Sequence, residues 1–302
     1  MTLAEVWNGA SWTVQTTPNP SGATDSDLDA VSCRSATACT AVGAYESRSG
    51  AQVTLAEVWN GNSWTVRTTP NPKGATDSGL DGVACRSATA CTAVGEYKSS
   101  SGAFETLVEV WNGTSWTVQT TPNPKGALGS HLDAVSCSSA TACTAVGTYQ
   151  SSYGAEVTLG EVWNGTSWTV QATANPSGAS YSDLYAVSCT SATACTAVGG
   201  SGNSSGTSET LAEVWNGTSW AVQTTPNPSG AVFGSELDAV SCRSAIACTA
   251  VGAYQGSSSA SEMLAEVRNG TSWAMQTTPN PSGATDSDLD AVSCGSAAAC
   301  TA

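Results

Sequence analysis

The stretch DAVSCRSATACTAVG, residues 29–43, decides the fold because the chain contains six copies of it. The other copies begin at Asp81, Asp133, Tyr185, Asp238 and Asp290, and the last one runs to Ala302. Tryptophans recur with the same spacing, at Trp7, Trp59, Trp111, Trp163 and Trp215, a period of 52 residues. Arg268 holds the sixth position, after one inserted residue. Self-similarity at a fixed period of this length is typical of solenoids and propellers.

Each repeat predicts four short β-strands. Residues 28–33 (LDAVSC) alternate apolar and polar side chains, and residues 39–45 (CTAVGAY) are rich in β-forming residues. Residues 54–59 (TLAEVW) and 64–69 (WTVRTT) flank the turn NGNS, and Asn-Gly between two such runs is a strong hairpin signal. Four strands per repeat and six repeats indicate an all-β fold, a six-bladed β-propeller. A stacked β-solenoid is the alternative, although its usual repeats are shorter.

The phase of the repeat predicts that one propeller occupies residues 1–302. The full blades are expected at about 28–69, 80–121, 132–173, 184–225 and 237–278. The chain opens with the third and fourth strands of a repeat and stops inside the second. We therefore expect a split sixth blade, in which residues 1–17 pair with residues 289–302 and close the ring. We expect a monomer, and the clipped last strand suggests a piece of a longer protein.

Composition and charge exclude several classes of function. The net charge is −15, with 24 acidic and 9 basic residues, and the sequence pI is about 4.1. This argues against nucleic-acid binding, because that affinity rests on Lys and Arg side chains that neutralise phosphates. No apolar run approaches the roughly 18 residues of a membrane span. Met1 leads directly into the first repeat, so we expect any export signal to lie upstream of this chain.

The twelve cysteines fall in six pairs, one pair per repeat, with five residues between the members. Each pair flanks a turn between adjacent strands, where paired strands bring Cα atoms within disulfide distance. The predicted disulfides are Cys33–Cys39, Cys85–Cys91, Cys137–Cys143, Cys189–Cys195, Cys242–Cys248 and Cys294–Cys300. Such usage predicts an oxidising compartment and thus an extracellular or cell-surface location. Zinc binding by these cysteines is less favoured, because no histidine or second pair is near. Redox chemistry is also less favoured, because no CxxC motif occurs.

The two tryptophans of each repeat face each other across a hairpin turn. Trp59 and Trp64 are one such pair, and we expect them to pack between neighbouring blades. The alternative is sugar binding, since an exposed indole offers a stacking surface for a sugar ring. The NGT motifs at Asn112, Asn164, Asn216 and Asn269 are formally glycosylation acceptors, but the turn itself explains their Asn and Gly.

Acidic residues recur in the strand that is expected to line the central channel. The six equivalent positions are Asp29, Asp81, Asp133, Tyr185, Asp238 and Asp290, and a ring of this kind would suit a cation. Asp25, Asp27 and Asp29 also form a DxDxD pattern, and oxygen-rich clusters suit calcium. The alternative is turn capping and solubility. Apart from this calcium candidate, no cofactor is predicted.

Residues 111–118 (WNGTSWTV) resemble the Asp-box turn of sialidase-like propellers, because Gly-x-Ser-Trp matches the Gly-x-Thr-Trp core of that box. Asn112 stands where the box has its Asp. The order AVG, EVW, W is similar to the kelch repeat, with one glycine where kelch usually has two. Near-identical blades resemble the repetitive bacterial propellers, some of which are lectins. These resemblances imply a propeller over the whole chain and leave the activity open.

The copies differ from one another on one side of the expected propeller. The turns SATAC and WNGTSW hardly vary, whereas the loops between the second and third strands, and between repeats, vary strongly. Repeat proteins commonly bind through the face that carries their variable loops. Candidate binding residues in or beside these loops are Phe104, Tyr153, Tyr181, Tyr185, Phe233 and His131, together with the six channel positions. His131, the only histidine, is equally explained as an ordinary loop residue.

These patterns favour non-catalytic recognition of a ligand, with a glycan or another surface polymer as the partner. Linked weak sites gain avidity without new contacts, which suits near-identical blades. The alternative is a structural or display module of a larger secreted or surface protein. A sialidase-like glycoside hydrolase is less favoured, because it needs an arginine cluster for the substrate carboxylate. Arg34, Arg86 and Arg243 are instead spread one per blade, and no catalytic set is evident.

Overall fold

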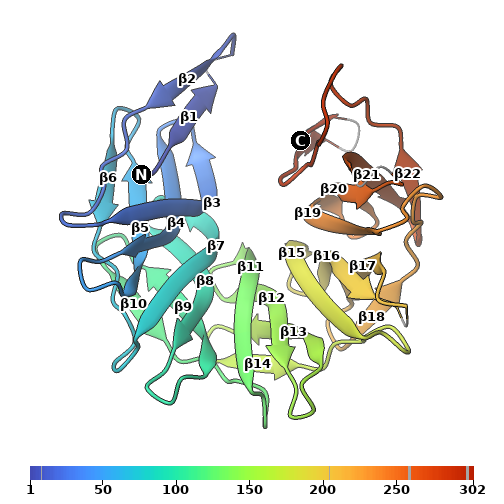
Figure 1. The fold of residues 1–302 in the computed structure, drawn as a ribbon. Coiled ribbons are helices and arrows are strands. Elements are labelled where there is room, and N and C mark those ends of the chain that lie inside the picture. Colours follow the sequence, from blue (N-terminus) through green and yellow to red (C-terminus); the bar gives the residue numbers. More distant parts are fainter. Residues whose placement is uncertain (8, 204, 258–259, 297–298) are drawn as a thin grey trace.

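The computed structural model describes residues 1–7, 9–203, 205–257, 260–296 and 299–302. These residues form 24 β-strands and no helix, which confirms the predicted all-β fold. None of the described residues belongs to a helix that could span a membrane. In the described residues, five four-stranded antiparallel sheets follow one another along an arc, as in a β-propeller (Figure 1), and one parallel residue pair, Ser208 with Gly234, links the fourth to the fifth. We number the complete sheets blades 1 to 5 and call the two-stranded sheets at the chain ends the N-terminal and C-terminal half-blades.

Each blade runs from a first strand on the inner side of the arc to a fourth strand on its outer side (Figure 1). The first strands are β3 (Asp25–Ser35), β7 (Asp77–Ser87), β11 (Gly129–Ser139), β15 (Tyr181–Ser191) and β19 (Gly234–Ser244). The second strands are β4 (Ala38–Glu46), β8 (Ala90–Lys98), β12 (Ala142–Gln150), β16 (Ala194–Gly202) and β20 (Ala247–Gln255). The third strands are β5 (Gln52–Trp59), β9 (Phe104–Trp111), β13 (Glu156–Trp163), β17 (Ser208–Trp215) and β21 (Ser261–Asn269). The fourth strands are β6 (Trp64–Arg67), β10 (Trp116–Gln119), β14 (Trp168–Gln171), β18 (Trp220–Gln223) and β22 (Ser272–Gln276). The half-blades are β1 (Ala4–Trp7) with β2 (Trp12–Gln15), and β23 (Ser293–Ser296) with β24 (Ala299–Thr301).

The first and second strands of every complete blade pair with a bulge at the same place. In blade 2, Leu80 pairs with Gly95 and the next pair joins Gly82 to Val94, so Asp81 is the extra residue. A β-carbon on Gly95 would lie 2.2 Å from the carbonyl oxygen of Gly79, which leaves room for glycine alone. Bulges redirect side chains and increase strand twist. The glycine of the AVG motif therefore recurs because the bulge requires it.

The tight turns between third and fourth strands explain the NGT motifs. Asn112 Oδ1 accepts hydrogen bonds from the backbone N–H groups of Thr114 (2.9 Å) and Ser115 (3.0 Å). Gly113 has a φ of 95°, in the left-handed region that glycine adopts without strain. An Asn side chain that caps its own turn, followed by glycine, closes the hairpin.

The apolar core lies between consecutive blades. Val42 and Ala56 of blade 1 pack with Leu80, Leu107 and Trp116 of blade 2, and all five side chains are buried. Sheets that pack face to face bury the alternate side chains that point toward the neighbouring sheet. The second tryptophan of each complete blade is buried in this way, which confirms the predicted packing role. Its partner lies across the hairpin, with ring centroids 5.7 Å apart in blade 1.

All six predicted disulfides are present. Each joins directly paired residues of a first and a second strand, as Cys137 and Cys143 do in blade 3, with Cα atoms 4.0 Å apart. Every bridge therefore lies within its own hairpin and holds the inner edge of its blade.

Replacing both Cys137 and Cys143 with alanine is expected to lower the free energy of unfolding by about 2 kcal/mol, because the unfolded chain regains the entropy of a short loop. Both residues are buried, so lost packing adds to this cost. Denaturant unfolding of the variant and the parent protein measures the difference. The same change at Cys294 and Cys300 should cost less, since Cys300 is exposed in a two-stranded sheet. An equal cost at both places, or none, would contradict the expectation.

The predicted closure of a sixth blade is corrected by the structure. The described residues of β1–β2 and β23–β24 form two separate two-stranded sheets, and these lie at opposite ends of the arc (Figure 1). In blade 1 the second strand pairs with the third through eight residue pairs, whereas β24 has three residues. The two half-blades therefore do not combine into one four-stranded blade within the described residues.

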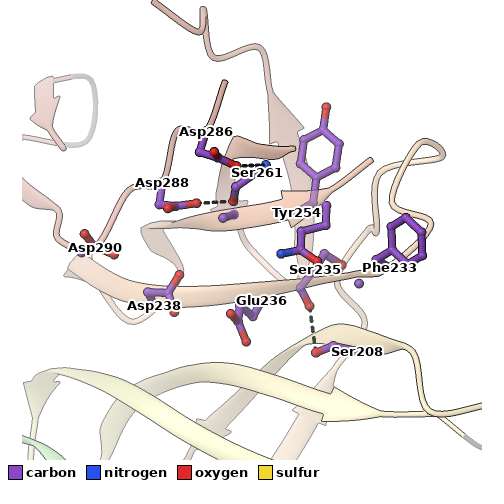
Figure 2. Close-up of a pocket in the computed structure, with 13 residues that line it drawn as sticks. Ser208, Phe233, Ser235, Glu236, Asp238, Tyr254, Ser261, Asp286, Asp288 and Asp290 are labelled. Carbon is purple, nitrogen blue, oxygen red and sulfur yellow. Dashed lines mark hydrogen bonds between the residues drawn. The ribbon is translucent and has the colours of Figure 1, made fainter. Parts of the chain in front are cut away.

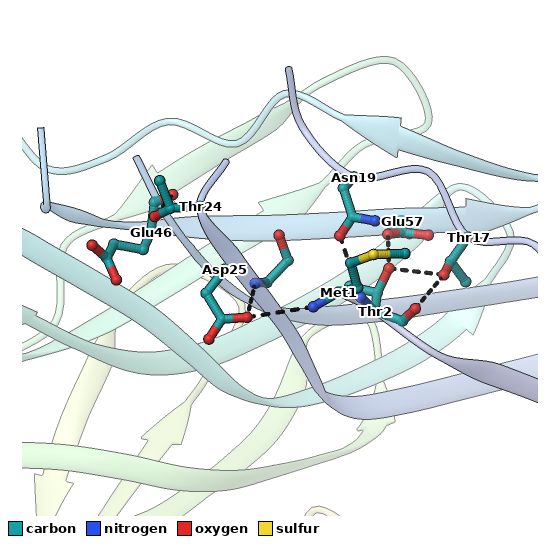
Figure 3. Close-up of polar contacts among 9 residues, drawn as sticks. Met1, Thr2, Thr17, Asn19, Thr24, Asp25, Glu46 and Glu57 are labelled. Atoms are coloured by element: carbon teal, nitrogen blue, oxygen red, sulfur yellow. Dashed lines mark hydrogen bonds and ion pairs between the residues drawn. The ribbon is translucent and has the colours of Figure 1, made fainter. Parts of the chain in front are cut away.

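The N-terminal half-blade joins blade 1 through polar contacts (Figure 3). The Thr2 hydroxyl donates to Glu57 Oε1 at 3.4 Å, and the Thr2 N–H donates to Asn19 Oδ1 at 3.2 Å. The hydroxyls of Thr2 and Thr17 lie 2.8 Å apart. In blade 2, Thr106 and Asn123 repeat the bond between the threonine N–H and the asparagine, at 3.1 Å. The half-blade is thus built and docked as a complete blade is.

Candidate binding sites on two faces of the propeller

The two faces of the propeller differ in charge. The turn face consists of the turns between first and second strands and between third and fourth strands, such as residues 34–38 and 59–64. These turns contain Arg34, Arg86, Arg243 and Arg268 and no acidic residue. The opposite face, the rim, consists of the loops between second and third strands and between blades. Its loops and the strand ends beside them carry most of the acidic side chains that are not buried.

The structure brings the predicted channel aspartates close to their equivalents in the next blade. Burial, and then carboxylates that include Asp29, raise the pKa of Asp81 to about 7. Burial, and then carboxylates that include Asp81, raise the pKa of Asp133 to about 8. Burial, and then carboxylates that include Asp290, raise the pKa of Asp238 to about 7. Like charges at these bulge positions disfavour one another's ionised form.

Tyr185 occupies the channel position of blade 4. Burial, followed by the carboxylate of Asp183, raises the pKa of its phenol, and Tyr181 lies near enough to contribute. His131 Nε2 lies 3.5 Å from Asp133 Oδ2, so a protonated His131 would form an ion pair with that carboxylate. Of the predicted binding residues, the structure therefore places Tyr181 near Tyr185 and His131 near Asp133.

A cavity of about 500 Å³ opens on the rim between blade 5 and the chain before the C-terminal half-blade (Figure 2). Three of the predicted residues line it, namely Phe233, Asp238 and Asp290. Its wall also includes Ser208, Glu236, Tyr254, Ser261, Asp286 and Asp288. The Ser261 N–H donates to Asp286 Oδ1 at 3.1 Å, and the Ser261 hydroxyl donates to Asp288 Oδ1. Carboxylates and two aromatic rings make this cavity a candidate for a ligand rich in hydroxyl groups.

The remaining rim aromatics lie apart from this cavity. Phe104 is 43% exposed, and the Lys98 ammonium lies 5.7 Å from the centre of its ring. Tyr153 is 96% exposed in the loop of blade 3. The variable loops of blades 4 and 5 include residues 204, 258 and 259, which lie outside the described residues.

The calcium candidate is not supported. Asp25 Oδ1 accepts a hydrogen bond from the Ser26 N–H at 2.9 Å and lies 3.4 Å from the N-terminal ammonium (Figure 3). The bulge at Asp29 interrupts the regular alternation that would keep it on one strand face with Asp25 and Asp27. Within the described ranges, no group of three or more His, Cys, Asp or Glu side chains is placed to hold a metal ion.

Cavities on the turn face lie at the boundaries between blades, and the sequence reasoning missed them. One of about 220 Å³ between blades 1 and 2 is lined by Arg34, Trp59 and Cys85. Another of about 220 Å³ between blades 2 and 3 is lined by Arg86, Gln119, Trp111, Trp163 and Trp168. A third of about 20 Å³, between blade 5 and the C-terminal half-blade, is lined by Arg243, Arg268 and Cys294. For the first two cavities the available signal was an arginine followed 25 residues later by a tryptophan, as in Arg34 and Trp59, and for the third it was Arg268 in place of that tryptophan.

Trp163 differs from its equivalents in the other blades. The indole N–H of Trp59 donates to the carbonyl of Ala36 at 3.1 Å, and Trp111 and Trp215 make the same bond in blades 2 and 4. The indole N–H of Trp163 donates to no described residue, and the side chain is only partly buried. It also lines a second, more open cavity of about 470 Å³ together with Pro122. Two cavities thus meet at this indole.

A fully buried glutamate in the third strand of each complete blade was also missed. The residues are Glu57, Glu109, Glu161, Glu213 and Glu266, and each is 0% exposed. Burial raises the pKa of Glu109, Glu161 and Glu266 to about 8, and that of Glu57 and Glu213 to about 7. A threonine of the preceding blade, such as Thr54 beside Glu109, offsets part of this rise. The sequence signal that could have revealed them is the glutamate that recurs at the same position of the otherwise apolar EVW strand.

No protein-family model matches the chain, and no curated protein matches its sequence. Among solved structures, AofleA from Arthrobotrys oligospora is similar, with a TM-score of 0.51 and 12% identity over 94% of this chain and 79% of that chain. A protein of unknown function from Dyadobacter fermentans has a TM-score of 0.52 and 10% identity, over 88% and 86% of the two chains. The fucose-specific lectin from Aleuria aurantia has a TM-score of 0.42 and 13% identity, over 84% and 79%. Sequence identities this low are evidence for a shared fold and not for a shared function. The first two similarities support the β-propeller fold. The Asp-box and kelch resemblances stay predictions.

Proposed function

We propose that the protein binds carbohydrate without transforming it, in the blade-boundary cavities of the turn face. The observation that carries the proposal is the cavity between blades 2 and 3, where Trp111, Trp163 and Trp168 lie beside Arg86 and Gln119. Binding cavities typically combine apolar and aromatic walls with a few placed polar groups. A sugar ring, with apolar C–H faces and hydroxyl groups at its edge, fits such a wall.

The polar groups of this cavity are placed to meet hydroxyl groups. The indole N–H of Trp163 has no acceptor among the described residues, and the exposed guanidinium of Arg86 offers several more donors. Gln119 Oε1 accepts a hydrogen bond from the indole of Trp168 at 2.9 Å, which holds its amide in place. Donors fixed before binding reduce the entropy lost when a ligand is bound.

We propose that binding is multivalent. The boundary of blades 1 and 2 repeats an arginine and a tryptophan around a cavity of the same volume, about 220 Å³. A branched or polymeric glycan would engage both boundaries at once. Linked sites of this kind gain avidity by about 10²–10⁴ without new contacts.

The positions of the arginines support a non-catalytic role. Arg34, Arg86 and Arg243 line three different cavities, so they do not converge on one carboxylate as a sialidase-like site would require. The six disulfides support an extracellular or cell-surface location, because such bonds persist in oxidising compartments.

The rim cavity is the second place at which a glycan could bind. Phe233 and Tyr254 offer aromatic surface there, and Asp238 and Asp290 offer acceptors for sugar hydroxyls. This is the location that the variable loops favour. The test must therefore distinguish binding at the rim from binding at the turn face.

Binding to a broad panel of immobilised glycans is expected, and Trp163→Ala should weaken the strongest hit by about tenfold or more, through lost stacking and a lost donor. Arg86→Gln, a change at an exposed side chain, should weaken it by a similar factor without affecting folding. The matched control is Arg48→Gln on the rim, which should bind as the parent protein does. Surface plasmon resonance measures all of these.

Two results would change this account. If Phe233→Ala abolished binding while Trp163→Ala and Arg86→Gln left it intact, the site would be the rim cavity. If folded protein bound no glycan of the panel, carbohydrate recognition would be wrong, and a structural or display module would take its place.

A further inference from the structure

We propose that the carbohydrate bound on the turn face is anionic, and that arginines at the blade boundaries bind its carboxylate or sulfate groups. This inference rests on the proposed carbohydrate-binding function and specifies the class of sugar. It is carried by the separation of charge between the two faces and by a buried guanidinium with an unpaired N–H group.

The turn face is suited to an anion even though the chain has a net charge of −15. The second strand of blade 1 runs from Ala38 at the turn face to Glu46 at the rim, nine residues in all. At about 3.3 Å per residue these ends lie roughly 26 Å apart. The Debye length at physiological ionic strength is about 8 Å, so exposed rim carboxylates are largely screened from the turn face.

The turn-face arginines are free to bind a ligand. Arg34, Arg86 and Arg243 are exposed, and neither ion pair among the described residues involves an arginine. Each of the three lines a boundary cavity. The planar fork of a guanidinium matches the paired oxygens of a carboxylate or sulfate, and such charge-assisted hydrogen bonds are the strong ones.

Arg268 is the second, independent observation. It is 7% exposed, and its Nη1 donates to the Ala245 carbonyl at 3.0 Å and to the Thr196 hydroxyl at 3.1 Å. Its Nε has no hydrogen-bond partner among the described residues, although a buried donor without a partner is costly. It lines, with Arg243, the cavity of about 20 Å³, which has room for one water-sized group. An anionic oxygen placed there would satisfy the unpaired N–H and meet two positive charges.

Arg268 replaces a tryptophan, and this makes a matched variant available. In blade 1 the indole of Trp59 donates to the Ala36 carbonyl, and in blade 5 the guanidinium of Arg268 donates to the equivalent Ala245 carbonyl. Arg268→Trp therefore restores the residue of the other blades and should preserve the fold while it removes the charge. At the remaining boundaries Ser138 and Thr190 hold the position of the turn arginine, so we expect no anion site there.

The test uses two pairs of probes that differ only in charge. Oligogalacturonate is compared with its methyl ester, and dextran sulfate with dextran, by titration calorimetry at low and at high salt. At least one charged member should bind about tenfold or more tightly than its neutral partner, and added salt should weaken it. The member that binds identifies carboxylate or sulfate. Arg243→Gln and Arg268→Trp should each weaken that binding by about tenfold, whereas Arg48→Gln on the rim should leave it unchanged.

The failure of this inference differs from the failure of the proposed function. Equal binding of charged and neutral members would overturn the preference for anionic sugars and leave carbohydrate binding intact. A preference for charge that survives both Arg243→Gln and Arg268→Trp would show that these arginines do not form the site. No binding to either pair, together with no hit on the neutral glycan panel, would overturn carbohydrate recognition itself.

Discussion

Lowering the pH from about 8 to about 5 should raise the melting temperature of the protein by roughly 10 °C. The cause is the set of fully buried glutamates, one in each complete blade, whose carboxyl groups face the preceding blade. Burial alone disfavours their ionised form, and no arginine or lysine of the described residues forms an ion pair with them.

Stability falls as the pH rises because the pKa values of these groups are raised in the folded protein. The pKa of Glu109 is about 8 in the folded protein, against 4.5 for an unperturbed glutamate, so between these pH values the folded state holds a proton that the unfolded state has lost. Stability from such a group is complete below about pH 4.5 and is lost as the pH rises through the folded pKa. Asp81, Asp133 and Asp238 titrate in the same direction. One pKa unit corresponds to about 1.4 kcal/mol, so even part of these shifts amounts to about 5 kcal/mol.

Variants separate the glutamates from the overall charge. The double change Glu109→Gln and Glu161→Gln should raise stability at pH 8, leave it nearly unchanged at pH 5 and flatten the dependence between them. Glu156→Gln, at an exposed position at the start of β13, is the control and should keep the parent profile. Differential scanning calorimetry across this range measures the effect. A melting temperature that is flat, or that rises toward pH 8, would contradict the account.

Gly95→Ala should destabilise the protein by about 3 kcal/mol, although it adds a single methyl group. The new carbon would lie 2.2 Å from the carbonyl oxygen of Gly79 and 2.8 Å from the Cα of Leu80, both backbone atoms of the paired strand. The strand pairing holds this backbone in place on either side of the bulge, so relief requires the bulge itself to break.

Gly79→Ala is the matched control, because a β-carbon there meets nothing within 4 Å. Its cost should stay below about 1 kcal/mol, the usual range for a change without a clash. Chemical denaturation compares the two variants. Equal stabilities would mean that the bulge does not explain the repeated glycine.

The architecture could be predicted because its signals are local. A period of 52, Asn-Gly turns and cysteines that flank a hairpin each specify strands or their connections within a few residues. The bulge could not be predicted, because it exists only in the pairing of two strands. The first strand of blade 1 also extends further than its alternation suggested, to Asp25, because Asp25 pairs with Glu46. Ring closure could not be predicted from local signals, because it depends on pairing between segments at the two ends of the chain, and the described half-blades form separate sheets.

The binding sites were less accessible to sequence reasoning. Variation among the copies points to the rim, and three predicted residues do line one rim cavity. The turn-face cavities arise instead from the stacking of consecutive blades. Residues 111–116 and 163–168 have the same sequence, WNGTSW, yet Trp111 bonds to a carbonyl and Trp163 does not. Identical local sequence thus gives an indole that is hydrogen-bonded to a backbone carbonyl at one boundary and an indole without that bond at the next.

The most direct test of the central claim is a crystal structure of the protein with a glycan that the binding panel identifies. The account predicts density for the sugar at the turn face between blades 2 and 3, stacked on Trp163 and within hydrogen-bond distance of Arg86. Density on the rim, beside Phe233 and Asp238, with an empty boundary at Trp163, would contradict it.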